Sequence, residues 1–212
     1  MMRLRLILAL VLAPLASPAM AAKPATEYAG ADGGYLAYAV GDIALGMHFS
    51  FPYRRVALPD GAPVSDWKGE IAPRLGGAIY LKVKNPDFEG RETGHVVVRR
   101  LPPGEYLIEN FAFYGSSPTG SAYAWSSAKP FAIRFRIEPG KATYIGSFMR
   151  APSPGPGVVP GIGPAGFFVI ADRSARDLPI ARPRLPGACE VVSQVTNVDA
   201  FGSAILRSRE PD

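Results

Sequence analysis

The sequence predicts an all-β protein folded as an antiparallel β-sandwich of about eight strands in a single domain. Three observations predict this fold. The chain contains 22 prolines and 23 glycines among 212 residues, a proportion typical of a protein with many turns. Several segments alternate apolar and polar side chains with a period of two. One phrase, an apolar run followed by Pro-Gly and then by a tyrosine that leads a new apolar run, occurs at 99–111 and again at 135–148.

The alternation locates the strands. Residues 131–138, FAIRFRIE, place phenylalanine and isoleucine at every second position, as a half-buried strand requires. Residues 167–171, FFVIA, are apolar throughout, which predicts a central strand covered on both faces. The expected strands are 35–41, 46–56, 78–84, 94–101, 105–114, 131–138, 141–150 and 166–172.

The repeated phrase predicts two reversals of the chain. Pro103-Gly104 and Pro139-Gly140 each supply the fixed φ of proline followed by a glycine that tolerates positive φ. Such turns twist against the strands of a tight two-residue hairpin. We therefore expect either longer loops or arches that pass from one sheet to the other, with positive φ at both glycines.

Two irregularities accompany the strands. Tyr106 and Ile108 have the opposite parity to Phe111 and Phe113, so a β-bulge near 109–110 is expected to bring all four onto the core face. Helical periodicity is confined to the C-terminal part of the chain.

One helical turn is expected at Ser174–Asp177, where serine three residues before aspartate is typical of a capping box. A second short helix is expected over 197–208, with Asn197 as its cap, although Gly202 disfavours it.

The first residues read as a cleavable signal peptide. Arg3 and Arg5 precede an apolar run over 6–16, and Ala19 and Ala21 frame a small-x-small cleavage site. The run is too short for a membrane anchor and contains a proline. We expect cleavage after Ala21, no transmembrane span in the mature chain, and a periplasmic or secreted location. The expected division is 1–21 signal peptide, 22–34 flexible segment, 35–186 β-sandwich and 187–212 C-terminal extension.

Charge and cysteine content restrict the partners. Loss of two arginines with the signal peptide leaves a net charge of +3 (23 − 2 − 18), and the arginines of 172–186 are interspersed with aspartates, as on a solvated face. This pattern does not predict a nucleic-acid partner. Cys189 is the single cysteine, so no intramolecular disulfide can form. It either pairs with another chain or lies buried as a small apolar residue.

Two phrases carry a family resemblance. LPPGEYLIENF (101–111) resembles the motif of prealbumin-like, or carboxypeptidase-regulatory-like, β-sandwich domains, in which Leu/Pro-Gly-x-Tyr opens a core strand. FRIEPGKATYIGSF (135–148), with the tail at 169–186, resembles small exported bacterial proteins of unknown function. The resemblance covers 94–186 and implies a prealbumin- or immunoglobulin-like sandwich and an exported protein. The resemblance implies no reaction. The chain has no cysteine near the expected cleavage site, so lipid anchoring is not expected.

No motif predicts a catalytic, metal or cofactor site. His48 and His95 lie in separate expected strands, whereas a zinc site requires ligands at short spacing. The acidic run NPDFEGRE (85–92) reads as a solvated hairpin loop. A Ser-His-acid triad assembled from distant residues remains an alternative, because its members meet only in space.

The segment 114–130 is the candidate contact surface. It is long, polar and rich in aromatic residues, a composition typical of adaptable contact loops with rigid anchors. The candidate residues are Tyr114, Ser116, Ser117, Thr119, Tyr123, Trp125 and Ser126. The alternative is that Tyr123 and Trp125 simply cap the end of the sandwich.

Two functions follow as hypotheses. The first is a non-catalytic binding or interaction module of the cell envelope, whose partner is an envelope protein or a glycan. The second is a secreted hydrolase with a site assembled from distant residues. A histidine within hydrogen-bonding reach of both a serine and a carboxylate in a cleft would favour the hydrolase.

Overall fold

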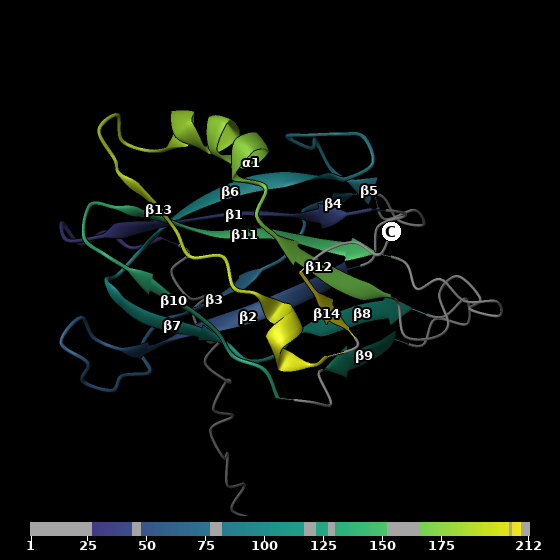
Figure 1. The fold of residues 1–212 in the computed structure, drawn as a ribbon, viewed down its shortest axis with the longest axis horizontal. Helices are drawn as coiled ribbons and strands as arrows, with labels where there is room; N and C mark the ends of the chain where they lie inside the picture. The colour runs from purple at the N-terminus through teal and green to yellow at the C-terminus, as the bar shows by residue number, and fades with distance from the viewer. Residues whose placement is uncertain are drawn as a thin grey trace, which may run out of the picture.

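The structure is a computed structural model that describes residues 27–43, 48–76, 82–116, 122–126, 130–151, 166–203 and 205–208. These residues are mostly β, with two principal sheets and short helices toward the C-terminus (Figure 1). The strands are β1 (Gly34–Asp42), β2 (His48–Ala57), β3 (Lys68–Ile71), β4 (Leu75–Gly76), β5 (Lys82–Val83), β6 (Thr93–Leu101), β7 (Gly104–Ile108), β8 (Ala112–Ser116), β9 (Ala122–Ser126), β10 (Ile133–Ile137), β11 (Ala142–Ala151), β12 (Phe167–Ala171), β13 (Val191–Ser193) and β14 (Leu206–Arg207). The helices are α1 (Ser174–Ala181) and the 3₁₀ turns η1 (Arg182–Arg184) and η2 (Val198–Phe201).

The first sheet is mixed. Its order is β14-β12-β11-β1-β6, with β13 also paired to β11. The neighbouring strands β1 and β11 run parallel. Both begin at the same end of the sheet, where the N–H of Tyr35 donates to the carbonyl of Lys141 (2.8 Å). Strands β13 and β14 are also added in parallel. The expectation of a wholly antiparallel sandwich is therefore wrong for this sheet, and residues after 186 contribute two of its strands.

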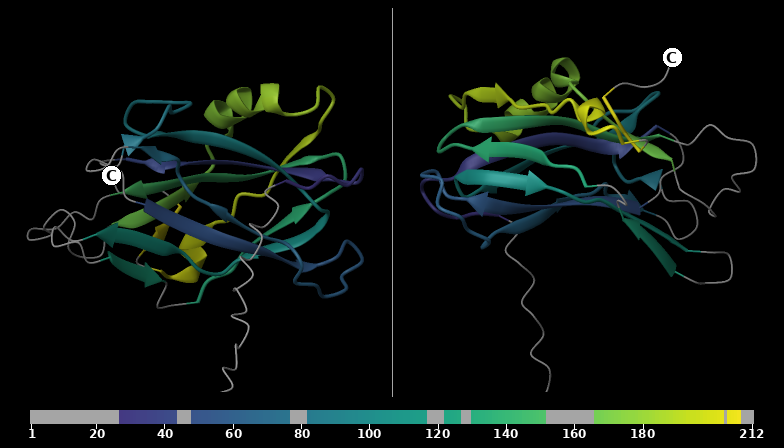
Figure 2. Two further views of the ribbon diagram at one scale, coloured as in Figure 1. Left: turned by 180° about the vertical axis from the view of Figure 1, so that it is seen from behind. Right: turned by 60° about the horizontal axis from the view of Figure 1, so that its bottom comes forward.

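The second sheet is antiparallel and has the order β10-β7-β2-β8-β9, with β3 also paired to β2. Strands β4 and β5 form a separate short pair. Figure 2 shows the two main sheets as two layers. Helix α1 lies against the outer face of the first sheet, where Ala181 packs with Val96, Met149 and Val169.

The core lies between the two sheets and is rich in phenylalanine. Phe168 of β12 reaches into a group of rings contributed by β2, β8 and the residues that precede β8. Its ring centroid lies 4.5–5.2 Å from those of Phe49, Phe51, Phe111 and Phe113. Strand β12 is buried on both faces, which confirms the interpretation of FFVIA as a covered central strand.

Both copies of the repeated phrase form arches between the sheets. Strand β6 belongs to the first sheet and β7 to the second, so the chain changes sheet at 102–103. Strand β10 belongs to the second sheet and β11 to the first, so the chain returns at 138–141. Gly104 has φ 145° and Gly140 has φ 70°, which confirms the expected positive φ at both positions.

The tyrosine of the first phrase secures its arch. The buried hydroxyl of Tyr106 donates a hydrogen bond to the carbonyl of Pro102 (2.8 Å), and its ring stacks on Phe135 with centroids 5.2 Å apart. A tyrosine that bonds back to the backbone a few residues upstream is the tyrosine corner of β-sandwich domains. The tyrosine of the second phrase, Tyr144, points instead to the outer face of its sheet and contacts α1.

The expected bulge is present. Tyr53 of β2 lies opposite Ile108, and Ser50 lies opposite Ala112. Three residues, 109–111, therefore oppose the two residues 51–52, which is the count that defines a bulge. The extra residue changes the parity, so that Ile108 and Phe111 are both buried in the core.

The C-terminal helices differ from expectation. Helix α1 has eight residues and continues through Pro179. Ser174 and Asp177 form no capping box: the side chain of Asp172 accepts from the N–H of Ser174 (2.8 Å), and Asp177 is turned into the protein. The expected helix over 197–208 is only the 3₁₀ turn η2, capped by Asn197, because Gly202 ends it in the left-handed region.

Several other expectations can be checked. Of the expected strand 78–84, residues 82–84 are described and β5 forms over Lys82–Val83, whereas the signal peptide and the stretch 152–165 lie outside the described residues. Cys189 is buried, and its thiol donates to the carbonyl of Gly140 (3.3 Å), in agreement with the interpretation as a small buried residue. No helix within the described ranges is long and apolar enough to cross a bilayer.

Candidate functional site

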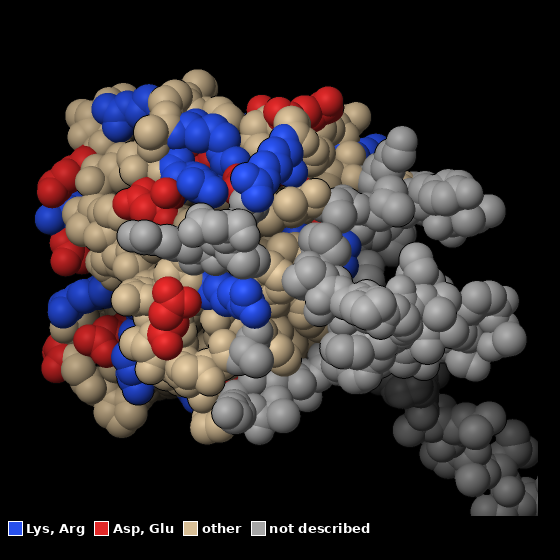
Figure 3. All heavy atoms as spheres, turned by 45° about the vertical axis from the view of Figure 1, so that its right-hand side comes forward, with Lys and Arg blue, Asp and Glu red and all other residues tan. Residues whose placement is uncertain are grey.

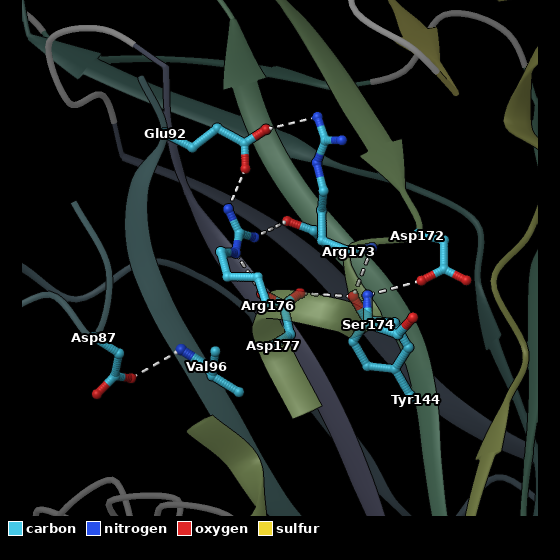
Figure 4. Close-up of polar contacts among 10 residues, drawn as sticks. Asp87, Glu92, Val96, Tyr144, Asp172, Arg173, Ser174, Arg176 and Asp177 are labelled. Carbon is cyan, nitrogen blue, oxygen red and sulfur yellow. Dashed lines mark hydrogen bonds and ion pairs between the residues drawn. The ribbon is translucent and has the colours of Figure 1, made fainter. Parts of the chain in front are cut away.

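A pocket of about 380 Å³ lies beside the start of α1, between that helix and the segment that leads into β6. Its lining residues come from two stretches that are about eighty residues apart in the sequence. They are Phe88, Glu89, Arg91, Glu92, Arg173 and Arg176. We call this site the arginine pocket, and Figure 4 shows the polar contacts at its base.

Glu92 joins the two sides of the pocket. Its carboxylate accepts from Arg173 (Nη2–Oε1 3.1 Å) and also pairs with Arg176 through its other oxygen. The Glu92 side chain is 11% exposed, whereas that of Arg173 is 44% exposed. Among the described residues, Glu92 is the single hydrogen-bond acceptor of the Arg173 side chain. The other N–H groups of this guanidinium can donate to an anion that enters from solvent.

Arg176 is fixed from several directions. Its Nε donates to Oδ1 of Asp177 (2.7 Å) and its Nη2 to the hydroxyl of Ser147 (3.1 Å). Its guanidinium carbon lies 3.7 Å from the centroid of the Phe88 ring, the geometry of a cation–π contact. These contacts hold the Arg176 guanidinium in one orientation at the wall of the pocket.

Asp177 lies beneath the pocket and is fully buried. It accepts from the hydroxyl of Tyr144 (2.6 Å), which in turn accepts from the backbone N–H of Arg173 (3.2 Å). Burial raises the pKa of Asp177, and the hydrogen bonds from Arg176 and Tyr144 oppose that rise only in part. The base of the pocket is thus a closed hydrogen-bonded network that ties α1 to β11.

A bulge in β11 makes this network possible. The ladder between β1 and β11 shifts register between Ala37 and Ala39, which lie opposite Tyr144 and Ser147. Gly146, with φ 105°, is the residue inserted there. Because of the extra residue, Tyr144 and Ser147 share the outer face although they are three positions apart, and both reach the elements around the pocket.

The two histidines do not meet. His48 is exposed at the start of β2 in the second sheet, whereas His95 is buried in β6 of the first. His95 Nδ1 lies 3.9 Å from Oδ2 of Asp87, and neither ring nitrogen has a hydrogen-bond partner among the described residues. Burial lowers the pKa of His95, which favours the neutral imidazole. Within the described part of the chain, no group of three or more His, Cys, Asp and Glu residues could hold a metal ion.

The two charged segments were expected to be solvated, and several of their charged residues are exposed, but the segments also pair with each other. Glu92 from the acidic run 85–92 pairs with Arg173 and Arg176. Asp87 from the same run pairs with Arg184 (2.6 Å). Each segment alone has the pattern of solvated surface charge. The only feature of the sequence that could have indicated their pairing is that one segment is acidic and the other is rich in arginine. On the face in Figure 3, Lys and Arg side chains lie interspersed with Asp and Glu.

The sequence-predicted contact residues belong to the other sheet. Tyr114 and Ser116 lie in β8, Tyr123 and Ser126 in β9, and Ser117 and Thr119 lie outside the described residues. The expected long loop therefore contains a hairpin, in which Trp125 lies opposite Phe113 and Tyr123 opposite Gly115. The role of these residues as binding anchors stays a prediction.

Searches against protein families, curated proteins and solved structures found no match.

Proposed function

We propose that the protein is an exported, non-catalytic binding module of the cell envelope, built on a prealbumin-like β-sandwich, and that its arginine pocket binds an acidic group of the ligand. The observation that carries the proposal is the convergence of Arg173 and Arg176 on one carboxylate at the wall of an open pocket. The pocket lining carries three arginines, Arg91, Arg173 and Arg176, beside two glutamates.

The residue types fit an acidic ligand. A guanidinium presents its N–H groups in a planar fork that matches a carboxylate or phosphate. Arg176 is oriented by Asp177, Ser147 and Phe88, so little of its freedom is lost when a ligand binds. The more exposed Arg173 can turn toward the ligand, and the ring of Phe88 offers an apolar wall beside the charged group.

The sandwich type is supported by the connections between the sheets. The tyrosine corner at Tyr106 and the two Pro-Gly arches are features of chains that cross between the sheets of a β-sandwich. They agree with the resemblance of 101–111 to prealbumin-like domains.

The positions of the histidines favour a binding module over a hydrolase. A triad requires a histidine that contacts both a nucleophile and a carboxylate in a cleft. His95 is buried, and Ser147, which accepts a hydrogen bond from the pocket residue Arg176, is 1% exposed. A substrate in the pocket would reach neither side chain.

Export gives the first prediction. If the signal peptide is cleaved as its small residues indicate, the mature chain begins at Ala22. Intact-mass analysis of protein isolated from the cell envelope or the medium measures this directly. A chain that still carries Met1 in that fraction would contradict the exported location.

Ligand binding in the pocket gives the second prediction. Inorganic phosphate is the probe, and at ten times its dissociation constant it should stabilise the wild-type protein by about 1.4 kcal/mol, seen as a rise in melting temperature. Arg173→Gln should weaken binding roughly ten-fold, because a hydrogen bond to a charged group contributes about 1.5–3 kcal/mol.

The matched control is Arg134→Gln, which removes an exposed arginine from β10 in the other sheet. Phosphate also stabilises proteins by exclusion from their surface, so the difference between the two variants is the readout. An equal phosphate response in the wild type and in both variants would exclude the pocket as the anion site.

A further inference from the structure

Strand β6 lies at the edge of the first sheet. It is nine residues long and contains the run Val96-Val97-Val98, which is favourable for strand pairing. An edge strand presents a row of outward N–H and C=O groups that can pair with a strand of another chain. Because strand residues alternate in direction, the outward groups of β6 are those of even-numbered positions, and the odd-numbered ones face β1.

Two side chains occupy the outward groups of Val96. Its N–H donates to Oδ2 of Asp87 (2.9 Å), and its carbonyl accepts from Nη1 of Arg184. Asp87 and Arg184 are joined to each other by two further bonds, Nη2–Oδ1 of 2.6 Å and Nη1–Oδ2 of 3.1 Å. We call this pair the edge clasp. It provides one acceptor and one donor, as a neighbouring strand would at this position.

The neighbouring positions are also engaged. Gly94 exchanges backbone hydrogen bonds with Phe88 (3.1 and 3.4 Å), and the carbonyl of Arg100 accepts from the N–H of Tyr28 (3.0 Å). Within the described residues, no hydrogen bond engages the outward groups of Val98. Release of the edge clasp would therefore leave two adjacent outward positions, 96 and 98, without partners.

Strand β10, at one edge of the second sheet, carries a similar device. On β10, the N–H of Arg136 donates to Oε1 of Gln194 (2.7 Å), and Nε2 of Gln194 donates to the Arg136 carbonyl (3.4 Å). Thr143 donates to the same carbonyl (2.6 Å). On each of two edges, then, side chains engage both outward groups of one residue, and on each edge one of these side chains comes from residues 182–194.

From this geometry we propose that the edge of β6 is a strand-pairing surface that the edge clasp keeps closed, and that the partner it fits once open is β6 of a second copy of this chain. Two copies of one edge pair antiparallel about a two-fold axis, and a pair centred on Val97 places Val96 of each copy opposite Val98 of the other, so that the two open positions meet. The inference goes beyond the proposed function, because it concerns an edge of the sheet rather than the arginine pocket.

The test is the double variant Asp87→Ala/Arg184→Ala. Its control, Glu89→Ala/Arg182→Ala, removes the same charges from the same two segments, and Arg182 bonds to the carbonyls of Gly187 and Cys189 rather than to β6. Light scattering coupled to size exclusion should find the wild type and the control monomeric and the double variant dimeric in a concentration-dependent way. A double variant that is folded and monomeric at its highest soluble concentration overturns the proposal.

A third substitution identifies the pairing strand. Val98→Pro removes an outward N–H that β1 does not use, and proline is tolerated at such edge positions. Added to the double variant, it should restore the monomer. A dimer that persists would show that the chains associate elsewhere, which also overturns the proposal.

Amide exchange decides the matter if the double variant does not fold. In the wild type, the Val96 amide should exchange slowly although it lies on an edge, and the single variant Asp87→Ala, which removes its acceptor, should speed its exchange at least about ten-fold while the inward amide of Val97 stays protected. Fast exchange of Val96 in the wild type would mean that the edge clasp does not close the edge.

Discussion

Replacement of Gly104 by alanine should destabilise the fold by about 3 kcal/mol or more, whereas the same change at Gly140 should remove only about 1 kcal/mol. Both glycines have positive φ, so both variants carry backbone strain. A Cβ at position 104 would also lie 2.4 Å from the carbonyl oxygen of Ala57 and 3.0 Å from Cδ of Arg55. At position 140 nothing lies within 4 Å of the added carbon.

Urea denaturation of the two variants beside the wild type measures both losses. The difference between them isolates the close approach of the first arch to β2, because the backbone strain is common to both. Equal losses at 104 and 140 would mean that the first arch is not packed against β2 as described.

Phe168→Ala should lower the free energy of unfolding by about 3–5 kcal/mol, the largest effect expected of any single truncation here. The ring joins the sheets: it belongs to β12 in the first sheet and contacts Phe49, Phe51 and Phe113, which come from strands of the second. Its removal would leave a cavity between the two layers that the surrounding rings cannot fill without moving both sheets.

Phe201→Ala is the matched control, because this residue of η2 is only partly buried and packs at the margin of the same core. Its loss should be clearly smaller, about 1–2 kcal/mol. Calorimetric or denaturant unfolding of both variants gives the comparison. Losses of similar size would indicate that Phe168 is not at the centre of a shared core.

Much of the fold could be predicted because its long strands carry their own signal. Alternation located β2 and β10, and the opposite parities of Ile108 and Phe111 located the bulge. The Pro-Gly phrases indicated arches, since a type II turn does not suit a tight hairpin. The order of the strands could not be predicted, because alternation carries no information about which strand lies beside which.

The short strands lacked a usable signal. Strands β13 and β14 have three and two residues, too few for a period to be recognised, and they form because β11 and β12 offer edges to pair with. Strand β9 was expected to be loop because glycine, serine and proline flank its alternating residues. In these places tertiary pairing, rather than local preference, determines the structure.

The candidate site was missed for a related reason. Glu92 and Arg176 are 84 positions apart, so each charge looks solvated in its own segment. Their pairing depends on α1 lying over the outer face of the first sheet and on the bulge at Gly146 that turns Tyr144 and Ser147 toward it. Both features become visible only once the sheet is assembled.

The central claim is that the arginine pocket binds an acidic group, and an amide-shift titration of isotope-labelled protein with inorganic phosphate tests it most directly. The account predicts saturable shifts confined to residues 88–92 and 173–177 in the wild type and roughly ten-fold weaker saturation in Arg173→Gln. Shifts that do not saturate, or that saturate equally in Arg173→Gln, would contradict it.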